Sequence, residues 1–128
     1  MKNLQFLILC LVTIHVSAQE AQRIIGIWKG TSICQIKSSP CHDENVVYHI
    51  SKTSSAEKFN LQMNKIVNGA EEDMGILEIN YDEKQSVFVS IDTVRNAKWT
   101  FKINGQKLEG TLLYKEQLYR VINATKSQ

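Results

Sequence analysis

Proline is nearly absent from this sequence, and neither sign of charge dominates it. One proline and six glycines in 128 residues exclude a collagen-like chain and a Pro/Gly-rich low-complexity chain. Fifteen basic and thirteen acidic residues give a formal net charge of only +2, which argues against a nucleic-acid-binding protein. Because 43% of the residues are hydrophobic, the chain can bury a core, and its length suits a single domain. A small globular domain remains.

The one long apolar run lies at the N-terminus and predicts a secretory signal peptide. Lys2 supplies a positive charge, residues 4–14 supply the apolar segment, and residues 16–18 (Val-Ser-Ala) form a small-residue cleavage site. The run is shorter than the roughly 20 residues that a transmembrane helix needs. We therefore expect a signal peptide over residues 1–18, one domain over residues 19–128, and an exported protein, secreted or periplasmic.

Removal of the signal peptide would leave two cysteines, Cys34 and Cys41. An exported chain matures in an oxidising compartment, and an even number of cysteines is what a disulfide requires. The residues between them include Ser38 and Pro40, which turn the chain back and let the two side chains approach each other. The spacing is not the C-x-x-C of a redox or zinc site. We expect a disulfide that fixes the loop from Lys37 to Asn45.

From Ile24 onward, apolar residues mostly recur with period two, which predicts strands and not helices. Short clusters of turn-forming residues separate the apolar runs, and Asn104–Gly105 is the strongest hairpin signal because a type I′ turn needs positive φ at both central residues. The pattern predicts eight strands, approximately over residues 24–36, 45–53, 58–68, 73–81, 86–93, 97–103, 107–115 and 118–125.

The connections between these strands are short, so antiparallel pairing of consecutive strands is the economical topology. Closing such a meander into a barrel removes its two exposed edges. A two-sheet sandwich is the alternative, but no long crossover segment is visible. We expect an all-β fold, an eight-stranded antiparallel up-and-down barrel. The residues expected on its inner face are Phe59, Leu61, Met63, Leu77, Ile79, Val87, Val89, Trp99, Phe101, Leu112 and Tyr114.

The first predicted strand contains Gly26-Ile27-Trp28, and a Gly-x-Trp at this position of an eight-stranded meander resembles the lipocalins and the wider calycin superfamily. The resemblance implies that Trp28 closes one end of the barrel and packs against an arginine of the last strand, which would be Arg120. An indole under a guanidinium gives a cation–π contact. The sequence departs from the family in its short length, in lacking a Thr-Asp-Tyr motif between the middle strands, and in lacking a C-terminal helical pattern.

An eight-stranded barrel is just wide enough either to be filled by side chains or to hold one small ligand. The leading interpretation is a non-catalytic barrel that binds a small apolar or amphipathic molecule. The residues expected to contact it are Phe59, Met63, Trp99, Phe101 and Tyr114. The alternative is a packed, ligand-free barrel that binds or inhibits a protein partner through the loop from Lys37 to Asn45.

Catalytic and metal-binding patterns are weak. Residues 42–44 (His-Asp-Glu) are consecutive and cannot easily point at one metal ion, so we interpret them as a solvated loop. Residues 71–73 (Glu-Glu-Asp) are interpreted as a solvated turn, and His49 is expected to face solvent. No Gly-x-Ser-x-Gly elbow and no phosphate-binding loop occur. We expect neither an enzyme nor a bound cofactor or metal. Residues 123–125 form a glycosylation sequon that matters only in a eukaryotic source.

Overall fold

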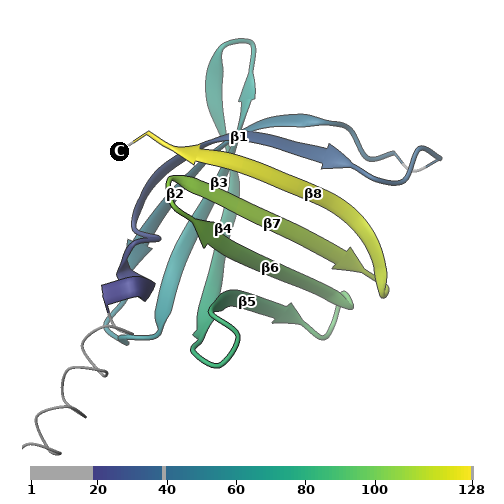
Figure 1. Cartoon of the computed structure of the whole chain (residues 1–128). Helices are drawn as coiled ribbons and strands as arrows, with labels where there is room; N and C mark the ends of the chain where they lie inside the picture. The colour runs from purple at the N-terminus through teal and green to yellow at the C-terminus, as the bar shows by residue number, and fades with distance from the viewer. Residues whose placement is uncertain (1–18, 39, 128) are drawn as a thin grey trace, which may run out of the picture.

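Eight antiparallel strands and a short helical segment at residues 19–22 make up the described part of the chain. The computed structural model describes residues 19–38 and 40–127, so the predicted signal peptide lies outside the described residues. Among these residues, no helix has the length and apolar character needed to cross a bilayer. The strands are β1 (Gly26–Cys34), β2 (Glu44–Lys52), β3 (Lys58–Val67), β4 (Ala70–Asp82), β5 (Val87–Asp92), β6 (Ala97–Asn104), β7 (Lys107–Tyr114) and β8 (Gln117–Lys126) (Figure 1).

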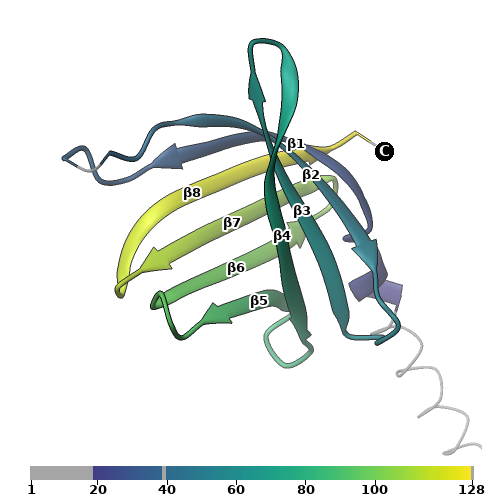
Figure 2. The ribbon, with the colours of Figure 1, turned by 180° about the vertical axis from the view of Figure 1, so that it is seen from behind.

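The strands follow one another in chain order around a closed barrel, and β1 pairs with both β2 and β8. Figure 2 shows the same barrel from behind, with β1 and β8 side by side. The predicted all-β, eight-stranded antiparallel up-and-down barrel is therefore confirmed. The strand boundaries differ from the predicted ones by three residues at most, at the start of β4.

Two-residue turns join several of the strands. Asn68–Gly69 (φ 51° and 81°) and Lys115–Glu116 (φ 51° and 64°) have positive φ at both central residues, as a type I′ hairpin requires. The predicted hairpin between β6 and β7 is present, but its type I′ turn at Asn104–Gly105 is wrong. Asn104 still belongs to β6, and only the glycine has positive φ, 62°. The turn residues are Gly105–Gln106, with glycine first, as in a type II′ turn.

Large apolar side chains fill the middle of the barrel. The fully buried ones there are Phe59, Leu61, Ile79, Phe88, Phe101, Leu108 and Ile122. Phe59 and Phe88 meet edge to face, with ring centroids 5.6 Å apart. Gly110 lies on the inner face beside this core, and a Cβ added there would come within 2.7 Å of the Phe101 ring. This glycine makes room for the aromatic ring.

The predicted inner face of β5 is wrong. Phe88 is 2% exposed and packs inside, so its neighbours Val87 and Val89 point outward and Ile91 is 64% exposed. The sequence of β5 is apolar on both faces, and alternation alone therefore did not identify the inner one. The pairing of Phe88 with both Tyr81 on β4 and Phe101 on β6 decides the orientation.

Trp28 is buried at one end of the barrel with Ala21 and Ile24, but Arg120 is not its partner. The Trp28 side chain is fully buried, its Nε1 donates a hydrogen bond to the Ile24 carbonyl at 2.8 Å, and Lys126 lies over its ring. Trp28 is opposite Lys126 in the β1–β8 ladder, whereas Arg120 is opposite Cys34. Six residues along a strand are about 20 Å, so Arg120 lies toward the other end of the barrel. The predicted contact between Trp28 and Arg120 is wrong.

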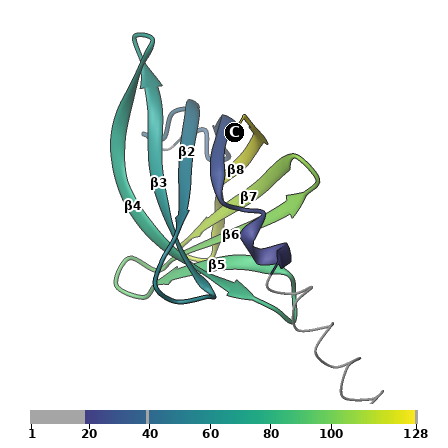
Figure 3. The same cartoon turned by 90° about the vertical axis from the view of Figure 1, so that its left-hand side faces the viewer.

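The hairpin of β3 and β4 extends well beyond the other strands, as Figure 3 shows. Only three residue pairs join β4 to β5, all between Asn80 and Asp82 on β4. Within the extension, Gln62 pairs with Ile76 but Asn64 pairs with Asp73, so β4 carries one extra residue at this point. Gly75, with φ 104°, lies in this bulge. The bulge and the long hairpin shape the open end of the barrel, opposite Trp28.

Candidate functional site

A cavity of about 230 Å³ lies inside the barrel toward the end that Trp28 does not close. Its apolar wall consists of Val46, Met63, Met74, Trp99 and Leu112, which come from β2, β3, β4, β6 and β7. Its polar lining consists of Ser32, Glu44, Tyr48, Asn64, Lys65 and Arg120. An apolar chamber with a few convergent polar groups has the composition of a small-molecule site.

Aromatic contacts hold the wall in place. Trp99 stacks on Phe101 with the ring planes 6° apart and the centroids separated by 6.1 Å. Tyr48 meets the same Phe101 ring edge on, at 6.3 Å. Phe101 is part of the packed core, so its ring fixes the positions of the Trp99 and Tyr48 side chains.

Arg120 organises the mouth of the cavity. Its Nη1 donates hydrogen bonds to the Ser32 hydroxyl at 3.1 Å and to the His42 carbonyl at 3.1 Å, and its Nη2 lies 3.6 Å from Glu44 Oε1. The guanidinium group joins β8 to β1 and to the start of β2. Because the Arg120 side chain is only 13% exposed, this ion pair is partly shielded from solvent.

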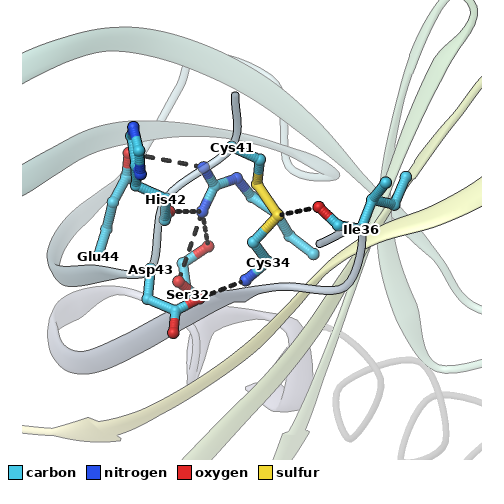
Figure 4. Close-up of polar contacts among 8 residues, drawn as sticks. Ser32, Cys34, Ile36, Cys41, His42, Asp43 and Glu44 are labelled. Atoms are coloured by element: carbon cyan, nitrogen blue, oxygen red, sulfur yellow. Dashed lines mark hydrogen bonds and ion pairs between the residues drawn. A yellow bond between two sulfur atoms is a disulfide. The ribbon is translucent and has the colours of Figure 1, made fainter. Parts of the chain in front are cut away.

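A disulfide joins Cys34 to Cys41, with the Cα atoms 5.9 Å apart, and confirms the predicted pairing. Asp43 reinforces the same loop, because its Oδ1 accepts a hydrogen bond from the Cys34 amide at 2.8 Å (Figure 4). The segment expected to be a solvated loop, residues 42–44, therefore has structural contacts. His42 contributes its carbonyl, Asp43 its carboxylate, and Glu44 an ion pair.

A second, wider hollow of about 450 Å³ lies outside this mouth. It is lined by the disulfide loop, by the upper part of β3 and by Tyr119. Glu44, Lys65 and Arg120 line both this hollow and the inner cavity. The two spaces therefore adjoin at these three charged side chains.

Tyr48 differs from the other polar residues of the cavity in the surroundings of its hydroxyl. It is 2% exposed, and within the described part of the chain no group forms a hydrogen bond with its hydroxyl. Burial raises the pKa of this phenol above its ordinary value of 10.0, and the nearby Glu44 carboxylate raises the pKa further, while Arg120 partly opposes the shift. The hydroxyl therefore remains protonated and able to donate.

The structure separates the residues that the sequence predicted as ligand contacts. Met63 and Trp99 line the cavity, whereas Phe59 and Phe101 are fully buried in the core. Tyr114, expected on the inner face, is 38% exposed and packs against Tyr119 with ring centroids 5.5 Å apart. Tyr114 keeps the alternation of β7, because it pairs with Ala97 just as Leu112 pairs with Trp99, but it is the last residue of the strand, where solvent reaches it.

Sequence reasoning missed Tyr48, Lys65 and Met74 as cavity residues. A usable signal existed for Tyr48, because Val46, Tyr48 and Ile50 alternate on one face of β2. The orientation of Met74 depends on the bulge in β4 and had no comparable signal.

Residues 71–73 belong to β4 and not to a turn. His49 lies on the outer surface, as expected, with its side chain 37% exposed, and its Nε2 is 2.7 Å from Glu71 Oε1. Asn64 Nδ2 donates to the same oxygen at 3.1 Å. These hydrogen bonds, that of His49 foremost, lower the pKa of Glu71. Across residues 19–38 and 40–127, no three His, Cys, Asp or Glu side chains are grouped to hold a metal ion.

Comparison with protein-family models and with curated proteins finds no match. Among solved structures, the chain is similar to a de novo designed fluorescence-activating β-barrel, with 12% identity and a TM-score of 0.56 over 84% of this chain and 96% of that one. It is also similar to a mutant of the fluorescent protein UnaG, with 13% identity and a TM-score of 0.50 over 83% and 97%. These likenesses concern the fold alone, a closed eight-stranded barrel with the lipocalin-like architecture that the sequence predicted.

Proposed function

We propose that this protein is an exported, non-catalytic barrel that binds a small apolar or amphipathic molecule in the cavity beside Trp99. The observation that carries the proposal is the cavity itself, about 230 Å³ with an apolar wall and charged groups only at its mouth. The similar designed barrel is described as fluorescence-activating, which fits a barrel interior that accepts a small molecule. The disulfide fits an oxidising, exported environment.

The size of the cavity limits the ligand. Drug-sized molecules occupy pockets of about 300–1,000 Å³, so a cavity of 230 Å³ suits a smaller one. At about 30 Å³ of liquid per water molecule, the cavity has the volume of about eight waters. A longer molecule would extend past the charged mouth into the outer hollow.

Titration with N-phenyl-1-naphthylamine, a neutral probe that fluoresces in apolar surroundings, tests this proposal. We expect saturable binding to the wild type. Leu112→Trp fills the cavity from β7 and should weaken binding at least tenfold. Leu113→Trp is the matched control, because Leu113 is next in the strand and is absent from the cavity lining.

Met74→Trp provides a second test, because Met74 is 47% exposed at the mouth and tolerates a larger side chain better than the core does. Circular dichroism confirms that each variant is folded. No saturable fluorescence in the wild type would overturn the proposal. Equal binding by the wild type, folded Leu112→Trp and folded Met74→Trp would overturn it as well.

A second candidate function is capture of a protein partner by the disulfide loop. The loop projects from the barrel beside the 450 Å³ hollow (Figure 1), and a fixed loop loses less conformational entropy on binding. Replacing Cys34 and Cys41 with serine frees the loop without touching the inner cavity. Loss of partner capture with probe binding retained supports this candidate, and undiminished capture contradicts it.

A further inference from the structure

The Tyr48 hydroxyl is a polar group inside a mostly apolar chamber, and no group of residues 19–38 or 40–127 forms a hydrogen bond with it. Among the described residues, no side-chain nitrogen or oxygen is both fully enclosed and without a hydrogen-bond partner. The Tyr48 hydroxyl has no hydrogen-bond partner in this part of the chain, so it has to face open space, and Tyr48 lines the cavity. The hydroxyl is therefore available to a molecule in the cavity.

We infer that the ligand is a small, planar, uncharged molecule that carries a hydrogen-bond acceptor such as a carbonyl oxygen, and that Tyr48 donates to it. This inference rests on the proposed function and names the chemical class of its ligand. A ligand that fills the cavity excludes water from this hydroxyl, which costs free energy unless an acceptor of the ligand forms a hydrogen bond with it. A hydrocarbon of the same shape has no acceptor and cannot form this hydrogen bond.

The charges around Tyr48 favour an uncharged acceptor. Glu44 is close enough for its carboxylate to raise the pKa of the phenol, so it also repels an anion placed beside the hydroxyl. The positive charge of Arg120 does not fully offset the repulsion by Glu44, because its guanidinium is bound to Ser32, His42 and Glu44. Lys65 lines the mouth of the cavity and the outer hollow.

The apolar wall favours a flat aromatic body. Trp99 is held parallel to Phe101 and presents a rigid aromatic surface. Met63 and Met74 line the cavity with it, and thioether sulfurs make favourable contacts with aromatic rings. A bicyclic aromatic ketone combines such a flat body with one hydrogen-bond acceptor.

A matched pair of compounds tests the acceptor. 2-Acetylnaphthalene and 2-isopropenylnaphthalene have nearly the same shape, but the ketone oxygen of the first is a CH₂ group in the second. Each is titrated against N-phenyl-1-naphthylamine bound to the full mature chain. We expect the wild type to bind the ketone about fivefold more tightly, the ratio that one buried hydrogen bond typically supplies.

Tyr48→Phe keeps the ring against Phe101 and removes only the hydroxyl, so the preference for the ketone should fall to a ratio of about one. Tyr114→Phe is the control, because it removes a tyrosine hydroxyl outside the cavity, and it should retain the wild-type ratio. A third compound, 2-naphthoate, tests the uncharged requirement and should bind more weakly than the ketone.

The outcomes separate this inference from the proposed function. If the probe binds and Leu112→Trp abolishes binding, but the two naphthalenes compete equally in the wild type, the inference is overturned and the proposed function stands. Tighter binding of 2-naphthoate than of the ketone also overturns the inference. A wild type that binds no probe removes the proposed function and the inference together.

Discussion

The Lys126 ammonium group lies 5.4 Å from the centre of the Trp28 ring and donates a hydrogen bond to the Arg23 carbonyl at 2.9 Å. Trp28 in turn donates to the Ile24 carbonyl. The end of β8, the start of β1 and the segment before β1 are therefore tied together at the closed end. Ala21 and Ile24 are buried there with the indole.

Lys126→Met should lower the free energy of unfolding by about 1 kcal/mol, because the variant loses the cation–π contact and the hydrogen bond to Arg23 but keeps an apolar stem. Urea unfolding followed by tryptophan fluorescence measures the change. Lys107→Met, at an exposed position on β7, is the control and should change stability by no more than about 0.5 kcal/mol. Equal stability of the two variants would contradict this assignment.

The closed end illustrates what the sequence could predict. Gly26 and Trp28 identified the strand and the end that closes, because the motif is local. The cation above the indole depended on the register of β1 against β8, which places Lys126, and not Arg120, opposite Trp28. Register depends on turn lengths around the whole barrel, and alternation within one strand does not supply it.

The same limit applies to the cavity. Met63 and Trp99 were predicted correctly as inner residues because each lies in a strand with clean alternation. Tyr114 was misplaced because it is the last residue of β7 and lies at the exposed end of the strand. Met74 was missed because a bulge in β4 turns it. Phe88 was missed because β5 is apolar on both faces. The fold followed from periodicity, whereas the site depended on irregularities.

Gly30 should be intolerant of any side chain. A Cβ at this position would come within 2.6 Å of the Ala124 Cα and would overlap the Asn123 carbonyl oxygen, both of them backbone atoms of β8. Because backbone atoms cannot rotate away, Gly30→Ala should lower the free energy of unfolding by about 2–3 kcal/mol. Thr31→Ala, the next residue in β1, is the control. Thermal unfolding of both variants checks the prediction. If Gly30→Ala were as stable as the wild type, β1 and β8 would have to separate easily.

Tyr48 should make the protein sensitive to alkali. The pKa of its phenol is raised in the folded state, chiefly by burial, above the ordinary value of 10.0. The resulting stabilisation is fully present below pH 10.0 and is lost as the pH rises above it, since the unfolded chain releases the proton first. Tyr48→Phe should therefore lose less stability than the wild type between pH 8 and pH 11. Urea midpoints at the two pH values measure this, with Tyr114→Phe as the control.

Glu71 should make a contribution of the opposite sign at acid pH. Hydrogen bonds from His49 and then Asn64 hold its pKa below the ordinary value of 4.5. The resulting stabilisation is present above pH 4.5 and is lost as the pH falls through the lowered pKa, since the unfolded chain takes up the proton first. Glu71→Gln should therefore lose less stability than the wild type between pH 7 and pH 3, and Glu72→Gln, at the next position of β4, should behave like the wild type. In His49→Ala, carboxyl NMR titration should show the pKa of Glu71 moving up toward 4.5. An unmoved pKa would mean that His49 does not bind this carboxylate in solution.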